Sequence, residues 1–354
     1  MKTPRLEVDL SKIAFNVRKM VSLYGSRGIN IIGVTKGVCG EPKIANVFLK
    51  NGISLIGDSR IANFIRMREA GIKAPFVLLR LPCLSEIEAV VEYADISLNT
   101  ELRIIKEISN IACKKKTKHK VILMVELGDL REGILPSELE ATAREVVALQ
   151  GVQLAGIGTN LACFGGVKPD DNNMKRLSAI AKDIEGIIGE KLDIISCGNT
   201  ANYYWINSTK DVGKINNVRL GESLLLGGIS LDGKGIPGSH KDAFRLVAEV
   251  IESIVKPSLP YGEIGLDAFG DVPEFEDRGQ IRRVILAIGQ QDVRLSGLIP
   301  QLDIDILGAS SDHLIVDAKQ TELKVGDEVE FDVDYGPMLA AMTSPYVWKR
   351  FLNE

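Results

Sequence analysis

The sequence predicts an α/β protein with an N-terminal (β/α)8 TIM-like barrel and a smaller, mostly-β C-terminal domain. Through most of the first 230 residues, short β-branched runs alternate with amphipathic helical stretches. About eight such units fit into roughly 200 residues, as closure of a (β/α)8 barrel requires. After about Gly228, strand-like runs follow one another with Gly, Pro and Asp turns between them. The predicted domains are therefore residues 1–230 and 231–354.

The elements of the first domain follow from hydrophobic periodicity. A strand over Arg5–Asp9 and a helix over Ser11–Tyr24 come first, with Ser11 as a candidate N-cap. A later helix places apolar residues every three or four positions up to Ile188, with Pro169 before it and Gly189 after it. The predicted barrel strands are Asn30–Val34, Ile53–Ile56, Phe76–Leu79, Ala94–Leu98, Val121–Glu126, Gln153–Ile157, Asp193–Ser196 and Asn217–Leu220.

The second domain is predicted as strands without intervening helices. Between the domains, Leu231–His240 contains three glycines and a proline, which is typical of a linker or a long loop. The predicted strands are Phe244–Ile254, Arg283–Ile288, Asp303–Leu307, Leu314–Val316 and Glu328–Val333.

An open doubly wound sheet is the alternative to a barrel. Such a sheet more often has fewer strands and a glycine-rich first turn. The chain has no G-x-G-x-x-G after a strand and no G-x-x-x-x-G-K-[ST], which weakens a nucleotide-binding interpretation.

Composition narrows the class of protein. The 43 Lys+Arg and 47 Asp+Glu leave a net charge of -4, which argues against nucleic-acid or membrane partners bound through bulk charge. The five cysteines form no C-x-x-C pair, and no run of about 18 apolar residues occurs. The N-terminus lacks the apolar region of a secretory signal. We therefore expect reduced thiols, no membrane span and a cytoplasmic location. The three histidines lack metal-ligand spacing, so no metal site is predicted.

Candidate chemistry lies where predicted barrel strands end. Lys36 follows the first barrel strand, and burial there would lower its amine pKa and make it a candidate Schiff-base nucleophile. The alternative is a rim lysine that reaches solvent. Thr200 and Gly221 follow strands seven and eight, where barrels build phosphate sites from backbone N–H groups. An amine facing a phosphate cradle suits pyridoxal 5'-phosphate, whose aldehyde and phosphate lie at opposite ends of the ring.

Four stretches, in order, resemble the fold-type III pyridoxal-phosphate enzymes of the alanine racemase family, and most of all its ornithine racemase branch. The resemblance covers nearly the whole chain. The stretches are Gly33-Val34-Thr35-Lys36, Gly158-Thr159-Asn160-Leu161-Ala162-Cys163, Ser196-Cys197-Gly198-Asn199-Thr200 with Arg219-Leu220-Gly221-Glu222, and Leu307-Gly308-Ala309-Ser310-Ser311-Asp312-His313.

The resemblance implies roles for individual residues. Lys36 would hold the cofactor as a Schiff base. Arg219 would face the pyridine nitrogen with support from Asn199, although a surface cation beside Glu222 is the alternative. The remaining positions that match are Thr200, Gly221 and Glu222 at the phosphate, Arg131 near the cofactor hydroxyl and substrate carboxylate, and Tyr335 near the phosphate or as a structural tyrosine.

Four departures from the family's pattern put the second catalytic base in doubt. Gln290 stands in place of the tyrosine that a partner subunit contributes, and an amide cannot exchange a proton near neutral pH. Met124 replaces a modified lysine, Asn160 a histidine and Gly40 a phosphate-binding tyrosine. Candidates for the second base are His313, Asp312, Asp292, Tyr346, Tyr335 and Cys163. For His313 a structural role, and for Cys163 an inert buried thiol, are the alternatives.

The resemblance implies a racemase that interconverts L- and D-ornithine, and also lysine or other basic amino acids, through a Cα carbanion. It also implies a homodimer with shared active sites. Candidate carboxylates for the basic end of the substrate are Glu222, Asp292, Asp312 and Glu126. Alternatives are an alanine racemase, a non-catalytic carrier of pyridoxal phosphate, and an aldolase-like barrel that uses Lys36. A decarboxylase of the same fold type is disfavoured because all five cysteines precede residue 198.

Overall fold

The structure, a computed structural model, describes residues 2–229, 234–267 and 269–353. The chain divides into two compact units, residues 13–241 and residues 1–12 with 242–354. The prediction assigned residues 1–12 to the barrel domain, whereas the structure groups them with the C-terminal sheet. The predicted boundary at residue 230 and Leu231–Gly233 of the predicted linker lie outside the described residues.

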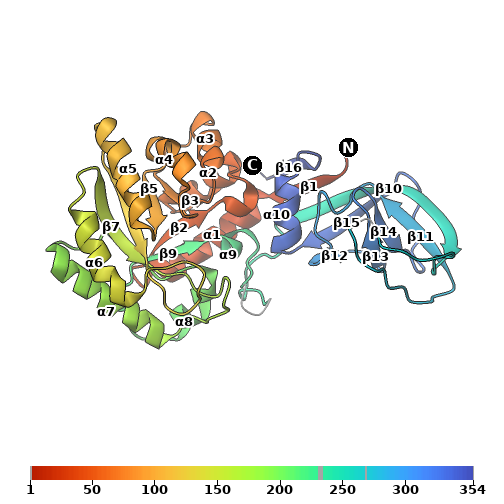
Figure 1. Cartoon of the computed structure of the whole chain (residues 1–354). Coiled ribbons are helices and arrows are strands. Elements are labelled where there is room, and N and C mark those ends of the chain that lie inside the picture. Colours follow the sequence, from red (N-terminus) through yellow and green to blue (C-terminus); the bar gives the residue numbers. More distant parts are fainter. Residues whose placement is uncertain (1, 230–233, 268, 354) are drawn as a thin grey trace. The chain divides into compact units, whose positions relative to one another are not determined.

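The unit of residues 13–241 contains a closed parallel barrel, which confirms the predicted fold class. The barrel closes where the first strand pairs with the last, with Asn30 opposite Asn217 and Gly33 opposite Leu220. Its apolar core includes Ile32, Val77, Ile96, Leu98, Ile122, Met124 and Ile194. In Figure 1 the helices lie outside these strands. The strands are β2 (Asn30–Val34), β3 (Leu55–Asp58), β4 (Phe76–Leu78), β5 (Ile96–Asn99), β6 (His119–Met124), β7 (Val152–Gly158), β8 (Ile194–Ser196) and β9 (Asn217–Leu220).

Helices follow the barrel strands, and their ends show how the sequence sets them. The longest, α7, has an Asp170–Asn173 capping box at its start and Gly189 in a left-handed conformation (φ 73°) at its end. The helices are α1 (Leu10–Gly25), α2 (Pro42–Lys50), α3 (Ile61–Glu69), α4 (Ile87–Tyr93), α5 (Leu102–Lys114), α6 (Pro136–Val147), α7 (Asp171–Ile188), α8 (Tyr203–Ser208) and α9 (Glu222–Leu225), with 3-10 turns η1 (Lys36–Val38), η2 (Leu84–Glu86) and η3 (Thr200–Asn202).

The prediction that Ser11 caps the first helix is wrong. Helix α1 begins at Leu10, and the Asp9 carboxylate accepts from the backbone N–H of Ser11 at 2.9 Å and of Lys12 at 3.1 Å. A carboxylate at this end satisfies donors that the first helical turn leaves free.

The second unit is a sheet with strand order β12-β15-β10-β11-β14-β13. Strand β1 pairs antiparallel with β10 and parallel with β16, so both ends of the chain join one sheet. The five predicted strands are present, and β12, α10 and β16 were not predicted. Helix α10 lacks a polar face, and Pro337 lies in its first turn, where proline is tolerated. The elements are β1 (Arg5–Asp9), β10 (Phe244–Pro257), β11 (Gln280–Leu286), β12 (Leu298–Pro300), β13 (Asp305–Ala309), β14 (Leu314–Asp317), β15 (Glu328–Val333), α10 (Tyr335–Thr343) and β16 (Trp348–Leu352).

Within the described part of the chain, no helix is both long enough and apolar enough to cross a membrane.

Candidate active site

Strand β2 delivers Lys36 to the end of the barrel. The strand ends at Val34, and Lys36 opens the 3-10 turn η1 directly after it. The Lys36 side chain reaches solvent, yet the protein packed around it still desolvates the amine. Desolvation is the main reason that its pKa lies below the ordinary value, as predicted. Among nearby groups, Cys163 and Asp58 raise this pKa, whereas Arg131 and Arg219 lower it. Residues from four different strand-end segments therefore share the surroundings of one amine.

A buried carboxylate that sequence reasoning missed anchors the turn before Lys36. Asp58 is fully buried at the end of β3 and accepts from the hydroxyl of Thr35, the residue before Lys36, at 2.7 Å. It also accepts from the backbone N–H of Ser59 at 2.6 Å, that of Arg60 at 3.1 Å and the Asn63 amide at 2.8 Å. Burial raises the Asp58 pKa although these bonds lower it. The carboxylate therefore ties β3 to the chain segment that carries Lys36.

Arg219 points into the interior of the protein from β9. It is 6% exposed, and its guanidinium donates to the Ser196 hydroxyl at 2.7 Å and to the Thr159 carbonyl at 2.8 Å. The alternative of a surface cation is therefore wrong. Burial lowers its pKa, and no ion pair with a carboxylate holds it among the described residues. A guanidinium stays charged even so, which leaves a fixed positive charge beside the barrel mouth.

Among the described residues, no hydrogen bond joins Asn199 to Arg219, and the predicted support of Arg219 by Asn199 stays a prediction. The Asn199 side-chain amide donates instead to the Leu161 carbonyl at 2.8 Å and to the Cys163 sulfur at 3.2 Å. Its carbonyl oxygen accepts from Ala201 N–H at 2.8 Å and caps η3. Asn199 thus connects the loops after β7 and β8.

The ends of β8 and β9 form a small hydroxylic cradle. The Thr200 hydroxyl lies 3.3 Å from the hydroxyl of Ser223, a residue that sequence reasoning did not single out, and both residues are buried. A Cβ added to Gly221 would lie 3.3 Å from Val34 Cβ, so glycine keeps the backbone close to β2. Hydroxyl donors beside an open backbone fit an anionic group such as phosphate.

Arg131 lies in the loop after β6. In the same loop, Asp129 forms hydrogen bonds to the loop after β7. Arg131 pairs with Glu132, and this hydrogen bond is the main reason that its pKa is raised. The buried Asp129 carboxylate accepts from the backbone N–H of Cys163 at 3.2 Å and of Phe164 at 3.0 Å. Cys163 is exposed, so the alternative that its thiol is buried is wrong.

The sequence of the barrel unit shows to which protein family the chain belongs. Residues 8–227 match the profile of the alanine racemase N-terminal domain. The chain belongs to the alanine racemase family. It is 41% identical over 353 residues to the ornithine racemase of Acetoanaerobium sticklandii, covering 99% of each chain. It is 39% identical over 351 residues to the lysine racemase of Thermotoga maritima, covering 99% of this chain and 98% of that one. The predicted resemblance is confirmed.

Solved structures agree on the fold. An alanine racemase of Clostridium difficile 630 has a TM-score of 0.78 at 20% identity, covering 99% of this chain and 96% of that one. The alanine racemase of Bartonella henselae was solved with covalently bound pyridoxal phosphate. Its TM-score is 0.75 at 20% identity, and the alignment covers 99% of this chain and 100% of that one.

One departure from the family's pattern has a clear structural cause. Gly40 has a φ of 61°, and a Cβ there would lie 2.6 Å from Cβ of Asn63, the residue that bonds Asp58. The network around Asp58 thus fills the space where a side chain at position 40 would begin. Met124, another departure, is fully buried in the barrel core.

The remaining predicted site residues lie in the sheet unit. His313 Nδ1 lies 2.7 Å from the Asp312 carboxylate; both side chains are exposed, and this hydrogen bond lowers the Asp312 pKa. Gln290 is exposed and donates to the Ala309 carbonyl at 3.0 Å. Asp292 is buried and accepts from the Ser344 hydroxyl at 2.5 Å. Tyr335 is the first residue of α10. The structure therefore gathers Lys36, Arg131, Asn199, Thr200, Arg219, Gly221 and Glu222 in one unit and Asp312, His313 and Tyr335 in the other.

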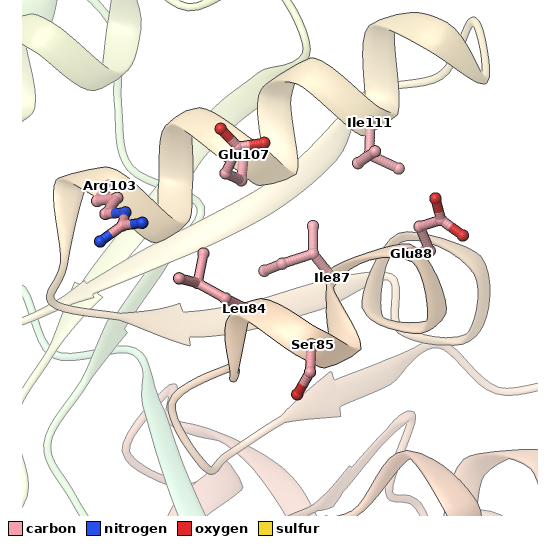
Figure 2. A pocket seen from close by; sticks show the side chains of 7 residues that line it. All are labelled: Leu84, Ser85, Ile87, Glu88, Arg103, Glu107 and Ile111. Carbon is pink, nitrogen blue, oxygen red and sulfur yellow. The ribbon is translucent and has the colours of Figure 1, made fainter.

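A separate groove runs along the outside of the barrel between α4 and α5. Figure 2 shows its lining side chains, among them Leu84, Ile87 and Arg103, and none is a predicted site residue. Among the residues that the structure describes, no three His, Cys, Asp or Glu side chains gather at a possible metal site.

Proposed function

We propose that this member of the alanine racemase family interconverts L- and D-ornithine with pyridoxal 5'-phosphate. The observation that carries the proposal is 41% identity over essentially the full length to a protein named ornithine racemase. The cluster around Lys36 supports it, because a desolvated amine, a buried arginine and a hydroxylic cradle meet at adjacent strand ends of one barrel.

The residues present fit this cofactor. Lys36 would hold it covalently through the amine, and Thr200, Ser223 and the backbone at Gly221 and Glu222 would bind its phosphate. Two features support this fit: the Gly221 backbone, which a Cβ would crowd, and the buried amide nitrogen of Asn160, which has no hydrogen-bond partner among the described residues. When bound, pyridoxal phosphate would supply the electron sink that stabilises negative charge at the substrate Cα.

The protein's own groups would orient the reaction and move the proton. The lowered pKa of Lys36 increases the fraction of unprotonated Nζ, which can accept the Cα proton on one face and return it. Arg219, fixed by Ser196 and Thr159, would place a permanent charge at the ring nitrogen and keep that nitrogen unprotonated. Arg131 would bind the substrate carboxylate.

A basic substrate needs a carboxylate or carbonyl groups at its far end. Internal hydrogen bonds already engage several of the candidate carboxylates: Asp292 accepts from Ser344, Glu126 accepts from Gly128 N–H at 2.5 Å, and Asp312 lies 2.7 Å from His313 Nδ1. Lysine is a second candidate substrate, because the 39% identical relative is named lysine racemase.

We also propose a homodimer in which the sheet unit of one copy completes the barrel site of the other. The family resemblance supports this homodimer. In it, Tyr335, Asp312 and His313 of one copy would contribute to the barrel site of the other. A cytoplasmic location is proposed because all five cysteines are free, as thiols remain in a reducing compartment.

The test is incubation of the purified protein and pyridoxal phosphate with one enantiomer of ornithine in deuterated water. Solvent deuterium at Cα together with decay of optical rotation is the expected result, and Lys36→Ala should abolish both. A yellow protein, which has bound pyridoxal phosphate, that leaves ornithine unchanged would indicate a non-catalytic carrier of the cofactor. Parallel incubations with lysine and alanine rank the substrates, and faster turnover of alanine would overturn the ornithine assignment.

A further inference from the structure

Racemisation requires two groups that exchange protons with Cα, because the proton leaves one face and is delivered to the other. Lys36 can serve only one face. The tyrosine that the family uses for the other is Gln290 here, and an amide does not exchange protons near neutral pH. The chain must supply a different group.

We propose that Cys163 is the second acid–base residue of the racemisation. This inference rests on the proposed racemase function. The Cα–H bond would break with its electron pair left on the substrate, and the Cys163 thiolate would take the proton. The Lys36 ammonium would then deliver its own proton to the opposite face of Cα. In the reverse direction Lys36 takes the proton and the Cys163 thiol gives one.

The first argument is position. Cys163 is exposed in the loop after β7, and its sulfur lies within electrostatic reach of Lys36, Arg131 and Arg219. Of the titratable side chains near Lys36, Cys163 has the strongest effect on the pKa of that amine. Thiolates gain reactivity beside cationic side chains, and three cationic residues lie within electrostatic reach of this sulfur.

The second argument is that the loop is built to hold this sulfur. Asn199 donates an amide N–H to Sγ at 3.2 Å, and Sγ lies 3.5 Å from the Asn160 carbonyl oxygen. The buried Asp129 carboxylate fixes the backbone N–H of Cys163. Directly before it, Ala162 has a φ of 57°, a left-handed conformation that residues with a side chain rarely adopt.

The third argument points to a bound group. Asn160 is 7% exposed, and its amide nitrogen has no hydrogen-bond partner in the described part of the chain. Its carbonyl oxygen faces the Cys163 thiol and the Asn199 amide, so the unused donor belongs to the same cluster. A buried donor without a partner is costly unless a ligand pairs with it.

The first test uses the wild-type protein without cofactor and measures alkylation of each cysteine by iodoacetamide, followed by peptide mass spectrometry. Cys83 and Cys113 are exposed and serve as internal references. Near neutral pH, Cys163 should react about ten-fold faster than either reference. Arg131→Gln should slow Cys163 and leave Cys83 unchanged. Equal or slower reaction of Cys163 in the wild type would overturn the proposal.

The second test follows each enantiomer of ornithine in deuterated water with the variants Cys163→Ala and Cys163→Ser. Racemisation should fall by about 10²–10⁴ in both. One enantiomer should still exchange its Cα proton without inversion, through Lys36, whereas the other should not. Rescue by serine, or equal loss of exchange for both enantiomers, would assign Cys163 a structural role and overturn the proposal. If the wild type racemises no amino acid, the proposed function has failed instead, and the alkylation result stands by itself.

Discussion

Two substitutions at Asp58 separate the shape of its hydrogen-bond network from its charge. Asp58→Asn keeps the side-chain shape and one carbonyl oxygen, which can accept the bonds that Oδ1 now receives from Ser59, Arg60 and Asn63. The new NH2 group would face the Thr35 hydroxyl, which can rotate to accept from it. Asp58→Ala removes every one of these acceptors.

The expected loss of stability follows from these contacts. Burial holds the Asp58 pKa above its ordinary value even though four hydrogen bonds lower it, so ionisation itself adds nothing to folding. We therefore expect Asp58→Asn to cost less than about 1 kcal/mol near neutral pH. In Asp58→Ala, the Asn63 amide and two backbone N–H groups lose their acceptor, while the Thr35 hydroxyl retains the Gly57 carbonyl at 3.3 Å. The buried Asn63 amide costs about 1–3 kcal/mol and the two part-buried N–H groups cost less each, so the total loss is roughly 2–4 kcal/mol.

The two tryptophans allow the barrel to be observed alone. Trp205 is buried in α8 of the barrel unit and bonded to Asp171, whereas Trp348 is an exposed residue of the sheet unit. In a Trp348→Phe background, urea unfolding followed by tryptophan fluorescence reports the barrel. The reasoning is refuted if the alanine variant loses less than about 1 kcal/mol, or if the two variants lose equal amounts.

Three further predictions concern single positions. Burial lowers the His119 pKa from 6.5 to about 4, so between these pH values the unfolded chain binds a proton at His119 and the folded chain does not. The free energy of unfolding therefore falls by roughly 3 kcal/mol as the pH drops from 6.5 to 4. In His119→Gln, the urea midpoint should lose this part of its pH dependence. In α7, Gly186→Ala should raise stability by about 0.5–1 kcal/mol, because, apart from the adjoining helical residues, no atom lies within 4 Å of the added Cβ and alanine favours the helix. Just after α7, Gly189→Ala should lower stability by about 1 kcal/mol, because the φ of 73° there strains an alanine. Thermal unfolding of the two variants tests both values. Gly221→Ala should weaken pyridoxal-phosphate binding about ten-fold in an absorbance titration, because its Cβ crowds Val34; unchanged affinity would remove Gly221 from the phosphate site.

The architecture was predictable because parallel barrel strands carry strong local signals. Strands buried on both faces read as apolar runs, and several observed strands differ from their predicted bounds by at most two residues. Pairing partners are not encoded locally. The strand Arg5–Asp9 was predicted with its observed bounds, yet nothing in its sequence shows that it joins β10 and β16 rather than the barrel.

An error of two residues explains why Asp58 was missed. The strand was predicted to end at Ile56, since glycine and aspartate are poor strand formers, but parallel pairing of Asp58 with Leu78 carries β3 onward. A carboxylate that sequence pattern places in a loop thereby lies at a strand end, beside Lys36.

For two other polar residues, the interpretation depended on whether the side chain is buried or exposed. Exposure is set by tertiary contacts, which the hydrophobic periodicity of the sequence does not report. The hydrophobic pattern does not determine the exposure of a thiol in a loop or of an arginine near the end of a short strand, so for Cys163 and Arg219 both a buried and an exposed position were considered. In both cases the structure rejects the alternative: the cysteine is exposed and the arginine is buried. The cause is shared, because Thr159 and Cys163 belong to one short segment. Its start accepts the Arg219 guanidinium inside the protein, and its end is turned outward through Ala162 and held by Asp129. A substitution that loosens this segment, such as Asp129→Ala, should therefore affect both the arginine and the thiol.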